Sequence, residues 1–460
     1  MHSRIVNAFL RPAAPAAAVL AALAGCEGLD GPRGGAHGAP DRLEPAEVRP
    51  FDLPRVDAVL LLTGGTHGRL EVCNCPGPMA GGLSRRSGMI FSYRRAFDPV
   101  VVLDSGDFFA IGGDDLRDPY LVKAYAAAGY DAVVLGANEW ATLGGCLAPS
   151  LKAATFACLS TNASADRPRL PLTRELVRPA GRGRLAVISY LGPGALRFIP
   201  AALAPLRLEG PEAVARRAGR LKSRGCVVVL LAHVGADELA DLAEVKGVDL
   251  IVRGHTTRPS ATVGRVGDIP VLKVGGREHV GAAALHIADG RIAGLDFRLE
   301  LVDTHWPLDR RVLDIYQAYA HEAMRQALRS ERREGLRYVP SATCGRCHQG
   351  EHRAWRAGPH RNVWGVLVRA GRTGDPECLM CHTSGFGTQH GFRTPQTTPK
   401  LTGVNCQDCH RFNLEADHGR RAVPEVPEDT CTLCHTPANS PKFDFADYRA
   451  HVGCVRAGRH

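Results

Sequence analysis

Four Cys-x-x-Cys-His motifs lie in the last quarter of the chain. They are Cys344, Cys347 and His348; Cys378, Cys381 and His382; Cys406, Cys409 and His410; and Cys431, Cys434 and His435. Two thiols at this spacing can form thioether bonds to the vinyl groups of one haem, and the adjacent histidine then lies under the iron as its proximal ligand. A zinc ribbon needs only two such cysteine pairs and no histidine after each. We therefore predict four covalently bound haems c.

The motifs start at residues 344, 378, 406 and 431, so the predicted haems cannot be insulated from one another by protein, and closely packed haems exchange electrons. The rest of the segment has little periodic pattern, as expected where porphyrins supply the apolar core. We predict a small, mostly helical or irregular tetrahaem domain at 337–460. A second histidine on an iron closes its coordination for electron transfer, whereas an open position binds small molecules.

The composition describes an ordinary globular protein long enough for two or three domains, with 45% hydrophobic and 6% aromatic residues. The net charge of +10 invites a nucleic-acid interpretation. However, the basic residues are scattered among acids, and no dense Lys/Arg run or aromatic RNA-binding motif is present. Haem propionates would also make the loaded protein less basic. We therefore expect no nucleic-acid partner.

Residues 1–26 have the pattern of a secretory signal. Arg4 and Arg11 precede a short apolar stretch from Ala13 to Leu23, which is too short for a membrane span. The sequence Leu-Ala-Gly-Cys26 resembles the lipobox of bacterial lipoproteins, which predicts lipidation of Cys26; a plain signal peptide is the alternative. Residues 27–54 have the composition of a flexible tether. These patterns predict a periplasm-facing lipoprotein of the bacterial cell envelope, anchored to the inner or outer membrane.

Residues 55–305 alternate between apolar β-branched runs and amphipathic stretches, which predicts an α/β domain. The expected strands are 58–62, 100–103, 132–135, 185–190, 227–231 and 250–252, and residues 211–222 are an expected helix. Residues 271–301 form successive short strands in this prediction. A connecting helix follows within 306–336, since Val312, Ile315, Tyr316 and Tyr319 have helical spacing.

The C-terminal segment resembles the tetrahaem cytochrome c family of electron carriers. The matching pieces are Trp355-Arg-Ala-Gly-Pro-His360, Cys381-His-Thr-Ser-Gly-Phe386, Val404-Asn-Cys-Gln-Asp-Cys-His410 with His418 downstream, and Phe443-Asp-Phe-Ala-Asp-Tyr448. The resemblance implies that His360 and His418 are distal haem ligands, and His390 and His451 are further candidates. Cys454 stands where the family usually has a histidine. Each of these histidines has a surface or propionate-contacting role as its alternative.

Residues 55–303 resemble the 5′-nucleotidase branch of the calcineurin-like metallophosphoesterases. The matching pieces are Leu62-Thr-Gly-Gly-Thr-His67-Gly68, Gly81-Gly-Leu-Ser-Arg-Arg86, Asp104-Ser-Gly-Asp107-Phe108, Gly129-Tyr-Asp-Ala-Val-Val-Leu-Gly136-Ala-Asn138-Glu139, Ala232-His233 and Gly254-His255-Thr-Thr257. The resemblance implies a four-layer β-sandwich flanked by helices. Active members hold two metal ions at the carboxyl ends of the strands, and the pair clamps a phosphate while a bridging hydroxide attacks.

The metal ligands that this resemblance implies are incomplete. His67, Asp107, His233 and His255 are present, whereas Gly65, Ala137 and Thr257 replace ligands and Asn138 replaces the histidine that stabilises the transition state. One metal would keep three protein ligands, Asp107, His233 and His255, and the other would keep two, His67 and the shared Asp107. We therefore expect weak or no phosphoesterase activity and one divalent metal ion, or a polar cleft without metal.

Six cysteines remain outside the haem motifs and the lipobox: Cys73, Cys75, Cys146, Cys158, Cys226 and Cys454. Cys226 opens an apolar strand and is interpreted as a buried small hydrophobe. Cys73 and Cys75 follow His67 and would lie at the mouth of the metal site. They are a candidate redox dithiol or soft metal ligand. Structural disulfides, for example between Cys146 and Cys158, are the alternative in an oxidising compartment.

The sequence as a whole predicts an exported multihaem cytochrome that transfers electrons between envelope redox partners, either redox proteins or quinol-linked membrane complexes. One alternative is a haem-linked oxidoreductase whose substrate binds in the N-terminal cleft. The other is an active metal-dependent nucleotide or phosphate-ester hydrolase with an accessory cytochrome.

Overall fold

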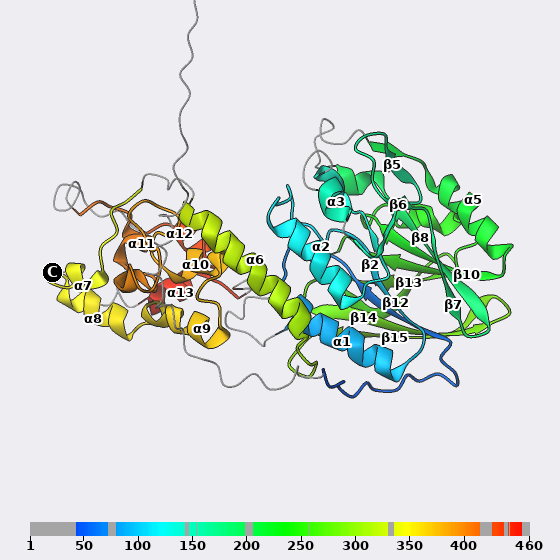
Figure 1. The fold of residues 1–460 in the computed structure, drawn as a ribbon, viewed down its shortest axis with the longest axis horizontal. Helices are drawn as coiled ribbons and strands as arrows, with labels where there is room; N and C mark the ends of the chain where they lie inside the picture. Colours follow the sequence, from blue (N-terminus) through cyan, green and yellow to red (C-terminus); the bar gives the residue numbers. More distant parts are fainter. Residues whose placement is uncertain are drawn as a thin grey trace, which may run out of the picture. The chain divides into compact units, whose positions relative to one another are not determined.

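The computed structural model describes most of the chain beyond residue 42, and residues 43–460 group into one compact unit (Figure 1). The described residues are 43–71, 80–142, 147–152, 154–197, 206–256, 258–329, 335–414, 426–436, 440 and 442–452. Eight residues or segments of the sequence predictions lie outside them: the signal segment with Cys26, residues 27–42 of the predicted tether, Cys73, Cys75, Cys146, Thr257, His418 and Cys454. No helix among the described residues combines the length and apolar character needed to cross a membrane.

Two large sheets form the N-terminal part. The first has the strand order β15-β14-β1-β2-β3-β4-β6, with bounds Arg291–Leu301, His279–Ala288, Ala58–Thr63, Val100–Asp104, Ala132–Val134, Ala157–Leu159 and Leu172–Thr173. The second has the order β12-β13-β11-β10-β8-β7, with bounds Ser260–Val266, Ile269–Lys273, Leu250–Arg253, Cys226–His233, Gly183–Leu191 and Leu176–Ala180. A small pair joins β5 (Ala163–Ala165) to β9 (Leu206–Leu208).

Successive residues of the central strands alternate between two apolar cores, because neighbouring side chains on a strand point to opposite faces. In β1, Leu60 and Leu62 lie in the core between the sheets, which also contains Val229 of β10. Val59 and Leu61 lie in the outer core against helices. Burial on both faces explains the continuous apolar runs in the sequence, as is usual for parallel strands.

Helices cover the outer face of each sheet (Figure 1). The helices of this part are α1 (Leu83–Ala96), α2 (Arg117–Ala128), α3 (Ala137–Ala141), α4 (Leu147–Leu151), α5 (Pro211–Lys222) and α6 (Arg310–Arg329), with short 3-10 turns at Pro193–Leu196 and Ala240–Glu244. Residues of α1, α2 and α6 pack on the first sheet, and α5 packs on the second through Val214, Ala218 and Leu221. The predicted four-layer α/β architecture is confirmed.

The predicted helices and strands agree with the observed ones to within a few residues, but the described residues 43–54 of the predicted tether instead pack on the outer core, where Phe51 is buried. Each of the six predicted strands is present, as β1, β2, β3, β8, β10 and β11, and α5 spans the predicted 211–222. The region 271–301 forms β13, β14 and β15. The helix predicted after the sheets is α6, and Val312, Tyr316 and Tyr319 are buried as their spacing predicted.

Short helices make up the described C-terminal part. They are α7 (Ser341–Cys344), α8 (Gln349–Ala357), α9 (Val363–Ala370), α10 (Pro376–His382), α11 (Cys406–His410), α12 (Glu428–Thr432) and α13 (Phe445–His451), with 3-10 turns at Pro359–Asn362 and Pro399–Leu401. The apolar core of this part is small and consists of Leu367, Cys378, Leu379, Phe392 and Leu401. Such a core fits the expectation that porphyrins supply much of the apolar interior.

Candidate metal and haem sites

The candidate metal residues lie at or just after the carboxyl ends of strands from both sheets. Asp107 lies three residues after β2, His233 is the last residue of β10, and His255 follows β11. The pair β1 and β2 is parallel, as is the pair β10 and β11. Ligands of α/β folds bind at this edge of a sheet because the loops after the strands meet there.

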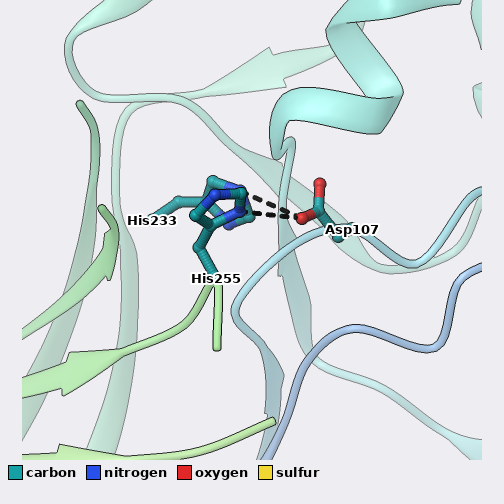
Figure 2. A group of neighbouring side chains, drawn as sticks. All are labelled: Asp107, His233 and His255. Carbon is teal, nitrogen blue, oxygen red and sulfur yellow. Dashed lines mark hydrogen bonds and ion pairs between the residues drawn. The ribbon is translucent and has the colours of Figure 1, made fainter. Parts of the chain in front are cut away.

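Three of the four predicted metal ligands converge on one point (Figure 2). One oxygen of Asp107, Oδ2, lies 3.4 Å from Nε2 of His233 and 3.1 Å from Nδ1 of His255. The ligand atoms of all three residues lie within 4.8 Å of one another. Two imidazoles and one carboxylate are a donor set that suits divalent first-row metals, so the residues present fit one ion.

Hydrogen bonding and charge orient this cluster. Nδ1 of the fully buried His233 pairs with the carbonyl oxygen of Ser105 at 2.8 Å, which directs Nε2 toward Asp107. Burial alone would lower the pKa of His233, but the Asp107 carboxylate outweighs burial and raises it to about 9. Burial by itself would raise the pKa of Asp107. The neighbouring His233 and His255 outweigh burial and hold the pKa of Asp107 well below its usual range. A bound cation would take the place of the proton in this cluster.

The backbone at the cluster is strained. His67, Asp107 and His255 have φ angles of 50°, 58° and 51°, in the left-handed region that non-glycine residues rarely adopt. Only one further non-glycine residue among those described, Asp289, has such an angle. Strain of this kind costs about 1–3 kcal/mol per residue and persists where the surroundings impose it, commonly at functional sites.

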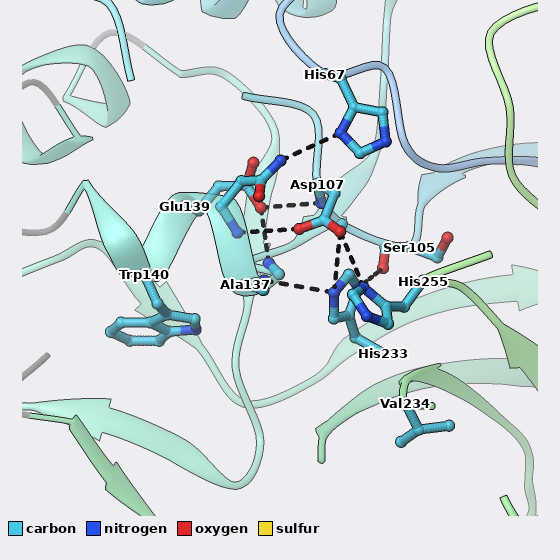
Figure 3. Close-up of polar contacts among 12 residues, drawn as sticks. His67, Ser105, Asp107, Ala137, Glu139, Trp140, His233, Val234 and His255 are labelled. Carbon is cyan, nitrogen blue, oxygen red and sulfur yellow. Dashed lines mark hydrogen bonds and ion pairs between the residues drawn. The ribbon is translucent and has the colours of Figure 1, made fainter. Parts of the chain in front are cut away.

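Glu139 holds the Asp107 loop in place, a role that the sequence did not reveal (Figure 3). Its buried carboxylate accepts hydrogen bonds from the backbone N–H groups of Asp107 at 3.0 Å, Phe109 at 2.6 Å and Gly136 at 2.7 Å. Burial, and then the negative charge of Asp107, raise the pKa of Glu139 to about 8. Its place beside Asn138 in the matching Gly136 to Glu139 segment was the signal that could have identified it.

His67 lies beside the cluster, outside the group of three (Figure 3). Its Nδ1 is 3.1 Å from the side-chain nitrogen of Asn138, which also donates to the carbonyl oxygen of Phe109 at 2.9 Å. A Cβ atom added at Gly65 would lie 3.3 Å from Nε2 of His67. A side chain at position 65 would therefore meet His67, which is the other ligand that the resemblance implies for a second metal.

The haem motifs lie on short helical turns. Cys378, Cys381 and His382 are on α10, and Cys406 to His410 form α11. Cys344 ends α7 and Cys431 lies in α12. One helical turn places residues three positions apart on the same side, so both thiols of a motif can reach one porphyrin edge.

Two of the predicted proximal histidines have Nδ1 engaged in a hydrogen bond. Nδ1 of His382 lies 2.7 Å from the carbonyl oxygen of Val363, and Nδ1 of His435 lies 2.9 Å from Oγ of Ser440. Pairing of Nδ1 leaves Nε2 available to iron. Nδ1 of His410 is buried without a hydrogen-bond partner among the described residues.

The motifs approach one another in pairs. The thiols of Cys344 and Cys406 are in hydrogen-bond contact. The thiols of Cys381 and Cys434 make the equivalent contact. The first motif is therefore next to the third, and the second is next to the fourth.

The candidate distal histidines differ in their surroundings. The ring of His360 lies 6.1 Å from that of His435, measured between ring centres, at an interplanar angle of 57°. Burial lowers the pKa of His360, and His435 adds to the effect, which favours the neutral form that binds metals. His390 and His451 are exposed.

A cavity of about 610 Å³ borders the second and fourth motifs, with Cys378, Cys381, His382, Cys434 and His435 in its walls. Cofactor sites commonly have volumes of about 300–1,000 Å³. Thiols, proximal histidines and cavity together fit covalent haem.

The remaining cysteines are also partly described. Cys158 and Cys226 are free, buried thiols, so the interpretation of Cys226 as a small core residue is confirmed. Cys158 is a free thiol in the interior at β4, and Cys146, its suggested disulfide partner, lies outside the described residues.

Comparisons with known proteins find similar proteins for the C-terminal part and for the N-terminal part of the chain. The family model "Cytochrome c554 and c-prime" matches residues 343–411. Cytochrome c-554 of Nitrosomonas europaea is 28% identical over 128 residues, covering 20% of this chain and 54% of the relative. The snake venom 5′-nucleotidase of Gloydius brevicauda is 28% identical over 252 residues, covering 47% of this chain and 40% of the relative. The chain joins a cytochrome c554-like part to a 5′-nucleotidase-like part.

Solved structures agree with the assignment of the 5′-nucleotidase-like part. The sulfate thiohydrolase SoxB of Thermus thermophilus aligns with a TM-score of 0.52 at 21% identity, covering 63% of this chain and 64% of its own. A 5′-nucleotidase precursor from Thermus thermophilus aligns with a TM-score of 0.51 at 24% identity, covering 61% of each chain. These likenesses show the fold. The chain spans only 40% of the length of the snake venom 5′-nucleotidase named above.

We predict that the purified protein binds at most one non-haem metal ion per chain and that Asp107→Ala abolishes this binding. Asp107 is the carboxylate that both histidines contact, and no other described cluster of this kind exists. Metal analysis by mass spectrometry, corrected for haem iron, measures the stoichiometry. Asp237→Ala is the matched control, since Asp237 is an exposed carboxylate of the same part, paired with Arg197. Two tightly bound ions in the wild type would contradict the prediction.

Proposed function

We propose that this protein is a multihaem c-type cytochrome that transfers electrons, and that its 5′-nucleotidase-like part is not a phosphoesterase. The observation that carries the first half is the spacing of His360 and His435, whose ring centres are 6.1 Å apart. Two imidazoles on opposite sides of one metal have ring centres roughly 6 Å apart, since metal–imidazole bonds are about 2 Å long. His360 would therefore hold the iron of the fourth motif from its distal side.

Two histidine ligands leave an iron without an open position, which suits electron transfer rather than small-molecule binding. The pairing of the motifs supports the same function. Cys344 lies against Cys406, and Cys381 lies against Cys434, so haems bound at these motifs would be neighbours. Electrons pass readily between neighbouring haems.

The second half of the proposal rests on the incomplete metal site. Asp107, His233 and His255 could hold one ion, which would act as a Lewis acid. His67 lies outside this cluster, and Gly65, Ala137 and Asn138 offer no replacement for the missing groups. Phosphate-ester hydrolysis in this fold depends on two ions that clamp the attacking and leaving oxygens, and described residues complete only one site.

The cellular setting is part of the proposal. Covalent haem attachment needs reduced thiols outside the cytoplasm, which agrees with the signal-like residues 1–26. We propose a periplasm-facing lipoprotein, anchored through Cys26, that exchanges electrons with redox proteins or quinol-linked membrane complexes.

Intact mass of the mature protein tests the cofactor number and the anchor together. The expected mass is that of the chain from Cys26 onward, with four haem groups and a lipid. Pyridine haemochrome quantification should also give four haems per chain. Two or fewer haems would contradict the cofactor prediction, and an unmodified residue 26 in the membrane fraction would contradict the anchor.

His360→Ala should convert one low-spin iron to high spin, because it removes the distal ligand of one haem and leaves the proximal histidine. Electron paramagnetic resonance and absorption spectra of the ferric protein measure the change. His321→Ala is the control, since His321 is an exposed histidine of α6. Unchanged spectra for His360→Ala would move the assignment to His390 or His451.

Hydrolysis is the second candidate function, favoured by the intact cluster of Asp107, His233 and His255. We expect no turnover of nucleoside monophosphates or simple phosphate esters with added manganese, zinc or calcium. Phosphate release assays on the wild type and Asp107→Ala decide between the two functions. Strong metal-dependent turnover that Asp107→Ala abolishes would establish the hydrolase.

A further inference from the structure

The cavity at the second haem motif has walls from both parts of the chain, which lie in one compact unit. The cytochrome c554-like part contributes Cys378, Cys381 and His382. The 5′-nucleotidase-like part contributes residues 68–71 and Arg117, and α6 contributes Tyr316 and Tyr319. We call this cavity the shared pocket.

Polar contacts hold the start of α10 against α2 and α6. Asp375 caps α10 by accepting a hydrogen bond from the backbone of Glu377 at 2.9 Å, and the hydroxyl of Tyr316 donates to the Asp375 carboxylate. The hydroxyl of Tyr319 donates to Glu377 at 3.0 Å. Arg117 of α2 pairs with the same Glu377 carboxylate at 3.1 Å. The helix that carries the second motif is therefore positioned by residues of the other part.

A buried ion pair joins the two parts at the same place. Glu71 lies 3.8 Å from Arg372, and their side chains are only 8% and 12% exposed. The Arg372 guanidinium also lies 5.0 Å from the ring centre of Tyr316, and the Glu71 carboxylate accepts a hydrogen bond from the backbone of Ser84 at 2.9 Å. Charges so poorly exposed to water act strongly on neighbouring groups, because little solvent screens them.

The segment that lines the shared pocket continues directly from the backbone that contacts the Asp107 loop. His67 donates its backbone N–H to the carbonyl oxygen of Asp107 at 2.9 Å, and Gly68 donates to that of Phe108 at 2.7 Å. Arg69 and Glu71, which follow directly, line the shared pocket. One short stretch of backbone thus borders both sites.

We propose that residues 68–71 of the 5′-nucleotidase-like part form a wall of the haem site of the second motif, and that Arg69 and Glu71 set the charge at that haem. This inference rests on the proposed haem attachment at Cys378 and Cys381. The haem propionates are carboxylates, for which the guanidinium of Arg69 is a suitable partner. The 5′-nucleotidase-like part then has a role that needs no hydrolysis: it tunes one haem, through the same loop that carries His67.

Opposite charge changes on this wall should move one reduction potential in opposite directions. Reduction of a haem iron lowers its positive charge by one, so a nearby cation favours the reduced form and a nearby anion favours the oxidised form. Arg69→Gln should therefore lower the potential of one haem, and Glu71→Gln should raise the potential of the same haem. Arg216→Gln is the matched control, because Arg216 is an exposed arginine of α5 in the same part.

Spectroelectrochemical titration of the full-length protein, resolved into its separate haem transitions, measures these shifts. The proposal is supported if the two variants shift one and the same transition with opposite signs while Arg216→Gln shifts none. Unchanged transitions for Arg69→Gln, or equal shifts of every transition, would overturn it. Arg69 is partly exposed, so its variant decides the question even if Glu71→Gln fails to fold. If the proposed haem attachment is itself wrong, the wild-type protein will already contain fewer than four haems. That result differs from a full haem content with unchanged potentials.

Discussion

The packing of two apolar sheet faces against each other is the constraint on which the rest of the structure depends. Leu60 and Leu62 of β1 meet Val229 of β10 in a core that excludes water, and burial of such side chains is the main favourable term in folding. Because this core fixes the position of one sheet against the other, the carboxyl ends of β2 and β10 meet at a common edge. The hydrogen bond from His233 to the carbonyl oxygen of Ser105, at 2.8 Å, links the two sheets there.

Asp107 lies at the centre of that edge. Its polar partners explain how the loop keeps a left-handed backbone conformation at this residue. Its carboxylate receives His233 and His255 on one oxygen and the backbone N–H of Asn138 on the other at 3.0 Å. The Glu139 carboxylate holds the adjacent backbone by accepting hydrogen bonds from the N–H groups of Asp107 and Phe109. A negative charge this deep in the protein requires such partners. The arrangement brings one group of candidate ligands together, whereas Gly65 and Asn138 supply neither a carboxylate nor an imidazole for a second group.

The cytochrome c554-like part follows a different physical principle. Its described apolar core contains only a few side chains, among them Leu379 and Phe392, and its helices are short. Covalent attachment of large apolar cofactors explains how such a chain can fold with so little side-chain core. Contacts from Tyr316, Tyr319 and Arg117 to the start of α10 add support from outside this part. In the function that we propose, these contacts let the 5′-nucleotidase-like part contribute to electron transfer.

The sequence by itself determined the features that depend on neighbouring residues in the chain. The haem motifs are local, because thiols and histidine lie within five positions, and the strands were recognisable because burial on both faces demands continuous apolar runs. Candidate ligands such as Asp107, His233 and His255 were found through the resemblance to 5′-nucleotidases, whose matching motifs are short stretches of sequence. Only the tertiary structure decided that His67 lies outside this cluster, that Glu139 holds the Asp107 loop, and that Glu71 pairs with Arg372. These relations join residues far apart in the chain, and their distances depend on how sheets and helices pack, which no local pattern encodes.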